Sequence, residues 1–94
     1  MKELKKELRR ELRREDFTEF HDKGYVPVLR YIVNDDYWIT IYADDDFWVT
    51  IWKREEGKPV DLTSFKNMSG VETRRYNCLR LSLIYANKRN KELQ

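Results

Sequence analysis

Residues 34–53, "NDDYWITIYADDDFWVTIWK", contain the same ten-residue pattern twice in succession. Each half begins with a polar acidic triplet. An aromatic residue, a Trp, a β-branched residue, Thr, Ile and a second aromatic residue follow in the same order. β-Branched and aromatic residues favour strands, whereas clusters of Asp and Asn favour turns. The pattern therefore predicts two adjacent strands, 37–43 and 47–53, each preceded by a turn.

A third strand is predicted just before the repeat. "YVPVLRYIV", residues 25–33, is rich in β-branched and aromatic residues and has Pro27 near its start, as an edge strand tolerates. Residues 25–53 are thus expected to form a three-stranded antiparallel meander. Neither acidic triplet contains Gly, so an Asn or Asp must adopt the left-handed conformation that three-residue hairpin loops usually need.

The register of this meander follows if each triplet closes a hairpin. Val33 then faces Tyr37, Ala43 faces Phe47, and every other pair is set by counting outward. One face of the sheet becomes aliphatic, with Ile39 opposite Ile51 and Ile41 opposite Val49. The other face carries three rows, which are Val28–Tyr42–Trp48, Arg30–Thr40–Thr50 and Ile32–Trp38–Trp52. A slip of one residue would exchange the two faces.

The N-terminal segment "KELKKELRRELRRE", residues 2–15, consists of strong helix formers, and we expect a charged helical extension over 1–15. Leu4, Leu8 and Leu12 recur every four residues, which makes a narrow, slanted stripe. The segment could be a solvated helix held on the domain by these leucines, a self-association helix or a nucleic-acid-binding arm. The helix either continues to about residue 22 or breaks near Asp16, where Asp16 and Glu19 fit a capping box.

The C-terminal segment is expected to form a helix over 70–91, because Ser69 and Glu72 fit a capping box and the basic "NKRNK" suits a helix C-terminus. As an alternative, the alternating leucines of "CLRLSLIY", residues 78–85, predict a further strand. Residues 54–69 read as a loop with a short edge strand at 60–62. The prediction is thus a single small α+β domain, 1–94, with the order α-β-β-β-α.

The chain offers little for catalysis, and we expect neither an enzyme nor a bound cofactor or metal. His21 is the only histidine and Cys78 the only cysteine, which excludes an intramolecular disulfide. A calcium loop starting at Asp44 fails because Trp48 stands where a ligand is needed. Without a secretory signal or a membrane-spanning apolar run, a cytoplasmic or otherwise intracellular protein is expected, of cellular, viral or designed source.

The aromatic face is the main functional signal, although a helix could simply cover it. We expect a non-enzymatic protein-binding module, such as a small inhibitor or regulator, that docks through this face and the acidic turn. The residues expected to contact the partner are Trp38, Tyr42, Trp48, Trp52, Arg30, Asp44, Asp45 and Asp46.

The alternative function is nucleic-acid binding, in which the aromatic side chains would stack on bases. Residues 57–94 carry eight basic and three acidic groups, whereas residues 34–56 carry two basic and seven acidic groups. The basic residues expected to contact phosphates are Arg74, Arg75, Lys88, Arg89 and Lys91.

Overall fold

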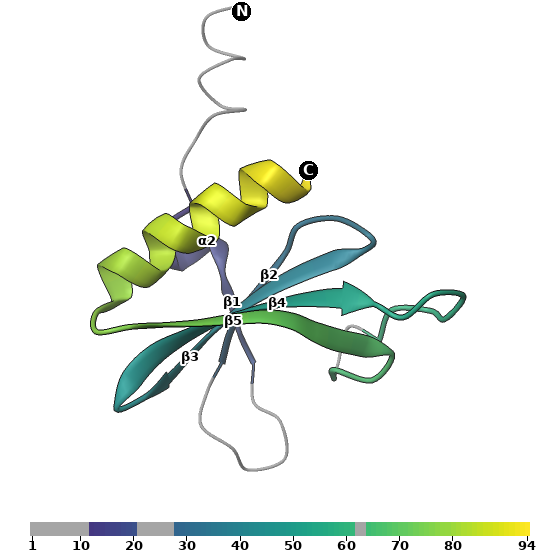
Figure 1. Ribbon diagram of the computed structural model, residues 1–94, viewed down its shortest axis with the longest axis horizontal. Helices are drawn as coiled ribbons and strands as arrows, with labels where there is room; N and C mark the ends of the chain where they lie inside the picture. The colour runs from purple at the N-terminus through teal and green to yellow at the C-terminus, as the bar shows by residue number, and fades with distance from the viewer. Residues whose placement is uncertain (1–11, 21–27, 62–63) are drawn as a thin grey trace, which may run out of the picture.

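The computed structural model describes residues 12–20, 28–61 and 64–94. They form one antiparallel sheet in the order β1-β2-β3-β4-β5, so every strand pairs with its neighbour in sequence, and the helix α2 lies across one face (Figure 1). The strands are β1 (Thr18–Phe20), β2 (Val28–Ile32), β3 (Tyr37–Asp44), β4 (Asp46–Arg54) and β5 (Met68–Tyr76), and the helix α2 is Leu79–Leu93.

The predicted α-β-β-β-α order is wrong at its N-terminal end. Residues 1–11 of the expected charged helix lie outside the described residues, but Arg14–Asp16 form only a 3₁₀ turn, and β1 replaces the helix expected to reach residue 22. Phe17 is 4% exposed and packs in the core, while β1 pairs with β2. Tertiary packing therefore overrides local helix propensity here. The expected capping box also differs, because the Asp16 carboxylate accepts a hydrogen bond from the backbone N–H of Arg13 at 2.8 Å.

The C-terminal prediction is wrong over residues 70–76, although a helix is present further on at Leu79–Leu93, and the alternative strand at 78–85 is wrong. Residues 68–76 are a strand rather than the start of a helix, and residues 79–93 are helical where alternating leucines indicated a strand. In β5, Thr73 pairs with Thr50 and Arg75 with Trp48, so the strand completes the rows of the aromatic face. The short strand expected at 60–62 is not formed at residues 60–61, and residue 62 lies outside the described part.

The predicted register of the central strands is confirmed. Ile39 pairs with Ile51 and Ile41 with Val49, and on the opposite face Trp38 pairs with Trp52 and Tyr42 with Trp48. Between β2 and β3, Val28 meets Tyr42 and Arg30 meets Thr40, also as expected. The period-2 pattern of the repeat therefore placed each side chain on its correct face.

The two acidic triplets close their hairpins differently. Asp45 takes the left-handed conformation expected of one residue in the turn, with φ 63°. In the first triplet no residue has a positive φ. Instead, Asn34 Oδ1 accepts hydrogen bonds from the backbone N–H groups of Asp36 and Tyr37, at 2.8 and 3.0 Å. An Asn side chain can thus replace a left-handed residue in holding such a turn.

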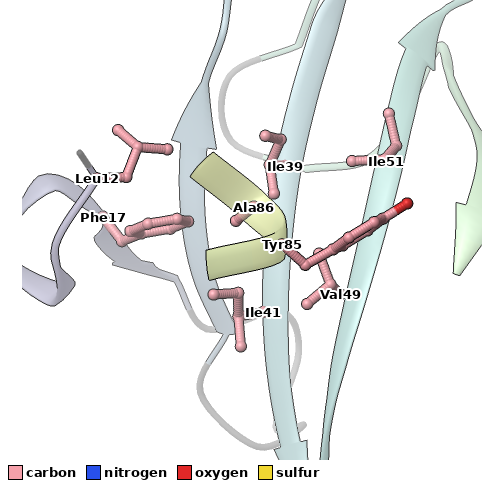
Figure 2. Close-up of a cluster of buried hydrophobic side chains, with 8 residues drawn as sticks. All are labelled: Leu12, Phe17, Ile39, Ile41, Val49, Ile51, Tyr85 and Ala86. Atoms are coloured by element: carbon pink, nitrogen blue, oxygen red, sulfur yellow. The ribbon is translucent and has the colours of Figure 1, made fainter. Parts of the chain in front are cut away.

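The core lies between α2 and the aliphatic face of the sheet (Figure 2). Ile39, Ile51 and Ala86 are fully buried there. Burying each isoleucine side chain stabilises the fold by about 1.5–3 kcal/mol. Near the helix, the backbone N–H of Leu12 donates to Asn87 Oδ1 at 3.1 Å, which fixes the described N-terminal end against α2. Among the described residues, no helix is long and apolar enough to cross a membrane.

Candidate functional site: a pocket on the aromatic face

The sheet face opposite α2 carries the aromatic rows of the repeat, and β5 extends each row by one position. The row of Tyr42 and Trp48 continues to Arg75, and the row of Thr40 and Thr50 continues to Thr73. The third row, of Trp38 and Trp52, continues to Gly70. This aromatic face, defined by these three rows, is therefore one continuous surface across β3, β4 and β5.

One half of the aromatic face, around Trp38, is covered. Phe65, from the loop between β4 and β5, stacks on Trp52 with ring centroids 4.5 Å apart and meets the edge of Trp38 at 6.3 Å. The Arg30 guanidinium lies 5.0 Å from the Trp38 ring centroid, and burial lowers the pKa of Arg30. Trp52 Nε1 donates to Thr40 Oγ1 at 2.8 Å. Trp38, which is 0% exposed, is thus a core residue.

The other half of the aromatic face is open and forms a pocket of about 700 Å³. Half-buried aromatic rings, three threonines and the aspartates of the β3–β4 turn line it. Its lining residues are Val28, Thr40, Tyr42, Asp44, Asp45, Asp46, Trp48, Thr50, Trp52, Phe65, Thr73 and Arg75. The hydroxyls of Thr50 and Thr73 are hydrogen-bonded to each other at 3.2 Å. The pocket lining therefore combines aromatic rings with hydroxyl groups.

The pocket is acidic at the turn. Three aspartates and one arginine line it, so its formal charge is −2. Asp46 pairs with Arg75, with 3.5 Å between Asp46 Oδ2 and Arg75 Nε, whereas Asp44 and Asp45 form no ion pair with any described residue. Carboxylates at one end of an aromatic pocket favour a cation there, through Coulomb attraction and through the ring faces.

Within residues 12–20, 28–61 and 64–94, no three His, Cys, Asp or Glu side chains come together in a way that could hold a metal ion. The first acidic triplet lies apart from the β3–β4 turn, because residues 34–36 join β2 to β3 at the opposite end of the strands. The two triplets therefore cannot pool ligands.

The pocket brings together six of the eight residues that the sequence indicated for partner binding, which are Tyr42, Trp48, Trp52, Asp44, Asp45 and Asp46. Trp38 and Arg30 belong instead to the covered half of the aromatic face. Sequence reasoning missed Phe65, whose only signal is a lone aromatic residue in a polar loop. It also could not assign Arg75 to this pocket, because it placed residues 70–91 in a helix.

The basic residues indicated for nucleic-acid binding do not gather on the aromatic face. Only Arg75 lines the pocket. Arg74 stacks over Tyr85 at 4.9 Å on the helix side, and Arg89 forms ion pairs with Glu72 and Glu92. The other two, Lys88 and Lys91, are exposed on α2. His21 lies outside the described residues, and Cys78 is half-buried just before α2.

No protein-family model, curated protein or solved structure matches this chain. Function is therefore inferred from the side chains of the pocket, because one fold can host many unrelated functions.

Proposed function

We propose that this protein is a protein-binding module that takes a basic side chain of its partner into the pocket beside Trp48. The observation that carries this proposal is the open pocket of about 700 Å³ on the aromatic face, which has an aromatic lining and one acidic end. Its volume falls within the range of about 300–1,000 Å³ that is typical of ligand sites.

The side chains of the pocket suit a protein anchor. Trp48 and Tyr42 are half-buried, so they still have apolar surface to lose when a partner docks. Trp and Tyr are enriched among the residues that dominate interface energetics. A cation above such a ring gains about 0.5–1 kcal/mol at an exposed site, and more once water is excluded. The acidic turn would also speed the approach of a basic partner.

Nucleic acid is the weaker candidate because the acidic turn repels phosphates. The lysines and arginines of α2 lie on the other side of the sheet from the pocket, so they could not hold a backbone whose bases stack on Trp48. Trp38, which would be needed for an extended stacking surface, is buried beneath Phe65 and Arg30.

The test is a titration with two matched peptides, GSGRGSG and GSGQGSG, both capped at their ends. Binding is followed through the three indole N–H signals in nitrogen–proton correlation spectra. We expect the arginine peptide to shift the Trp48 signal with millimolar affinity, and the glutamine peptide to shift it far less, because only the arginine supplies a cation. The Trp38 signal should stay in place.

Two variants with the same change in charge test whether the arginine side chain binds at the acidic end of the pocket. Asp45→Asn should weaken binding of the arginine peptide about two- to fivefold, because it removes a carboxylate from the pocket end. Asp35→Asn makes the same charge change at the other end of the strands and should leave the affinity unchanged. Equal effects of the two variants, or equal binding of the two peptides, would contradict the proposal. Single-stranded RNA that shifts the Trp48 signal, with an affinity falling steeply with salt, would replace it by the nucleic-acid alternative.

A further inference from the structure

The pocket already contains a cation, which is a side chain of the protein itself. The Arg75 guanidinium lies 5.8 Å from the ring centroid of Trp48. Its Nε is 3.5 Å from Asp46 Oδ2, at the acidic end of the pocket. Arg75 therefore makes, within the chain, the two contacts that an incoming basic side chain would make, one with an aromatic face and one with a carboxylate.

Both contacts of Arg75 are weak enough to be exchanged. Its side chain is 64% exposed, and the ion pair with Asp46 is long. Exposed ion pairs of this kind contribute little, and solvent and salt screen them. Arg30, in the covered half, is not exchangeable in this way, because it stacks over the fully buried Trp38.

We infer that Arg75 is an internal ligand of the pocket, which a partner's arginine side chain displaces when it binds. This inference rests on the proposed function. Arginine is the expected ligand rather than lysine because a planar guanidinium can stack on Trp48 while it pairs with a carboxylate, whereas an ammonium is a compact, strongly hydrated charge. Asp44 and Asp45, which have no ion-pair partner among the described residues, would receive the displaced or the incoming guanidinium.

Displacement has a measurable consequence. While Arg75 lies over Trp48, it competes with an incoming guanidinium for the ring face, and the apparent affinity falls by the fraction of molecules in which the ring face is free. Removing the internal ligand should therefore tighten binding, although Arg75 lines the pocket. A residue that helped to hold the partner would have the opposite effect.

The experiment compares variants at neighbouring positions of β5 in the titration with GSGRGSG. Arg75→Gln should tighten binding about three- to tenfold, because no arginine of the chain then competes for the Trp48 ring and the pocket loses its one positive charge. Arg74→Gln is the matched control. It makes the same charge change one residue away, but Arg74 lies on the helix side over Tyr85, so the affinity should change less than about twofold.

Arg75→Lys separates competition from charge. It keeps the net charge, but lysine is a poorer competitor for the ring face, so binding should still be tighter than in the unaltered protein. Urea unfolding of each variant checks that the fold is intact, and both side chains are exposed enough for that to be expected.

The outcomes distinguish this inference from the proposed function. If the arginine peptide shifts the Trp48 signal but Arg75→Gln binds no tighter than Arg74→Gln, the pocket binds cations and the displacement inference is overturned. Weaker binding by Arg75→Gln overturns it too, because Arg75 would then help to hold the partner. If the peptide reaches Trp48 in neither the unaltered protein nor the Arg75→Gln variant, the proposed function itself fails.

Discussion

Asp45 and Asn34 show how two nearly identical acidic triplets reach different turn geometries. Asp45 holds its backbone in the left-handed region, which costs an L-residue free energy that Gly does not lose. Asn34 has no positive φ and closes its turn with its side chain instead. The same side chain also donates a hydrogen bond from Nδ2 to the carbonyl oxygen of Leu93 at 3.0 Å. One turn is therefore closed by a left-handed residue and the other by a side-chain acceptor.

The left-handed turn leads to a prediction. Asp45→Gly should raise the free energy of unfolding by about 0.5–1 kcal/mol, because Gly adopts a positive φ without steric cost and the change also removes one of three adjacent carboxylates. Urea denaturation followed by far-ultraviolet circular dichroism measures the change. Asp35→Gly is the control, since Asp35 has no positive φ, and it should destabilise the fold. Equal effects at the two positions would show that the turns do not differ as described.

At the level of elements, β2, β3 and β4 could be predicted with their register because the repeat alternates strictly and its turns are short. β5 could not be predicted, since Ser69 and Glu72 imitate a capping box and the residues that decide its conformation lie far away in sequence. Thr73 pairs with Thr50, and Glu72 forms an ion pair with Arg89 of α2 at 3.3 Å. Long-range pairing of this kind outweighs a local signal.

The observed start of α2, at Leu79, differs from the predicted start at residue 70 for the same reason. The observed start has a weak N-cap. Cys78 occupies the N-cap position with extended backbone, but its side chain caps nothing, and the first turn contains no acidic residue. Ser and Asp are preferred at N-caps because their oxygens accept hydrogen bonds from the free N–H groups of the first turn. A thiol is a poor acceptor for this purpose.

Cys78→Ser should therefore raise the free energy of unfolding by about 0.5–1 kcal/mol, since the hydroxyl is close in size to the thiol and can cap the helix. For a domain of this size the midpoint of thermal unfolding should rise by roughly 2–8 °C. Cys78→Ala serves as the control, because it removes the thiol without adding an acceptor. A serine variant no more stable than the alanine variant would mean that the start of α2 is not limited by its cap.

At the scale of the whole molecule, one helix covers the aliphatic face, whereas the aromatic face is shared between a covered half and an open half. The sequence indicated two apolar faces and enough helix to cover both, but β1 and β5 use residues that were assigned to helices. Phe65 packs over Trp38 and Trp52 instead. It is a loop residue, so no periodic pattern in the sequence predicts this contact. This is why six residues of the pocket could be predicted while its boundary could not.

The division of the aromatic face between these two halves is the central claim, and the three indole N–H groups report on it directly. A soluble gadolinium chelate broadens the signals of protons that solvent reaches, and single Trp→Phe variants assign the three indoles. Trp48 should broaden most, Trp52 less because Phe65 stacks on it, and Trp38 least because it is fully buried. Equal protection of Trp48 and Trp38 would show that the pocket is closed, and strong broadening of Trp38 would show that Phe65 and Arg30 do not cover it.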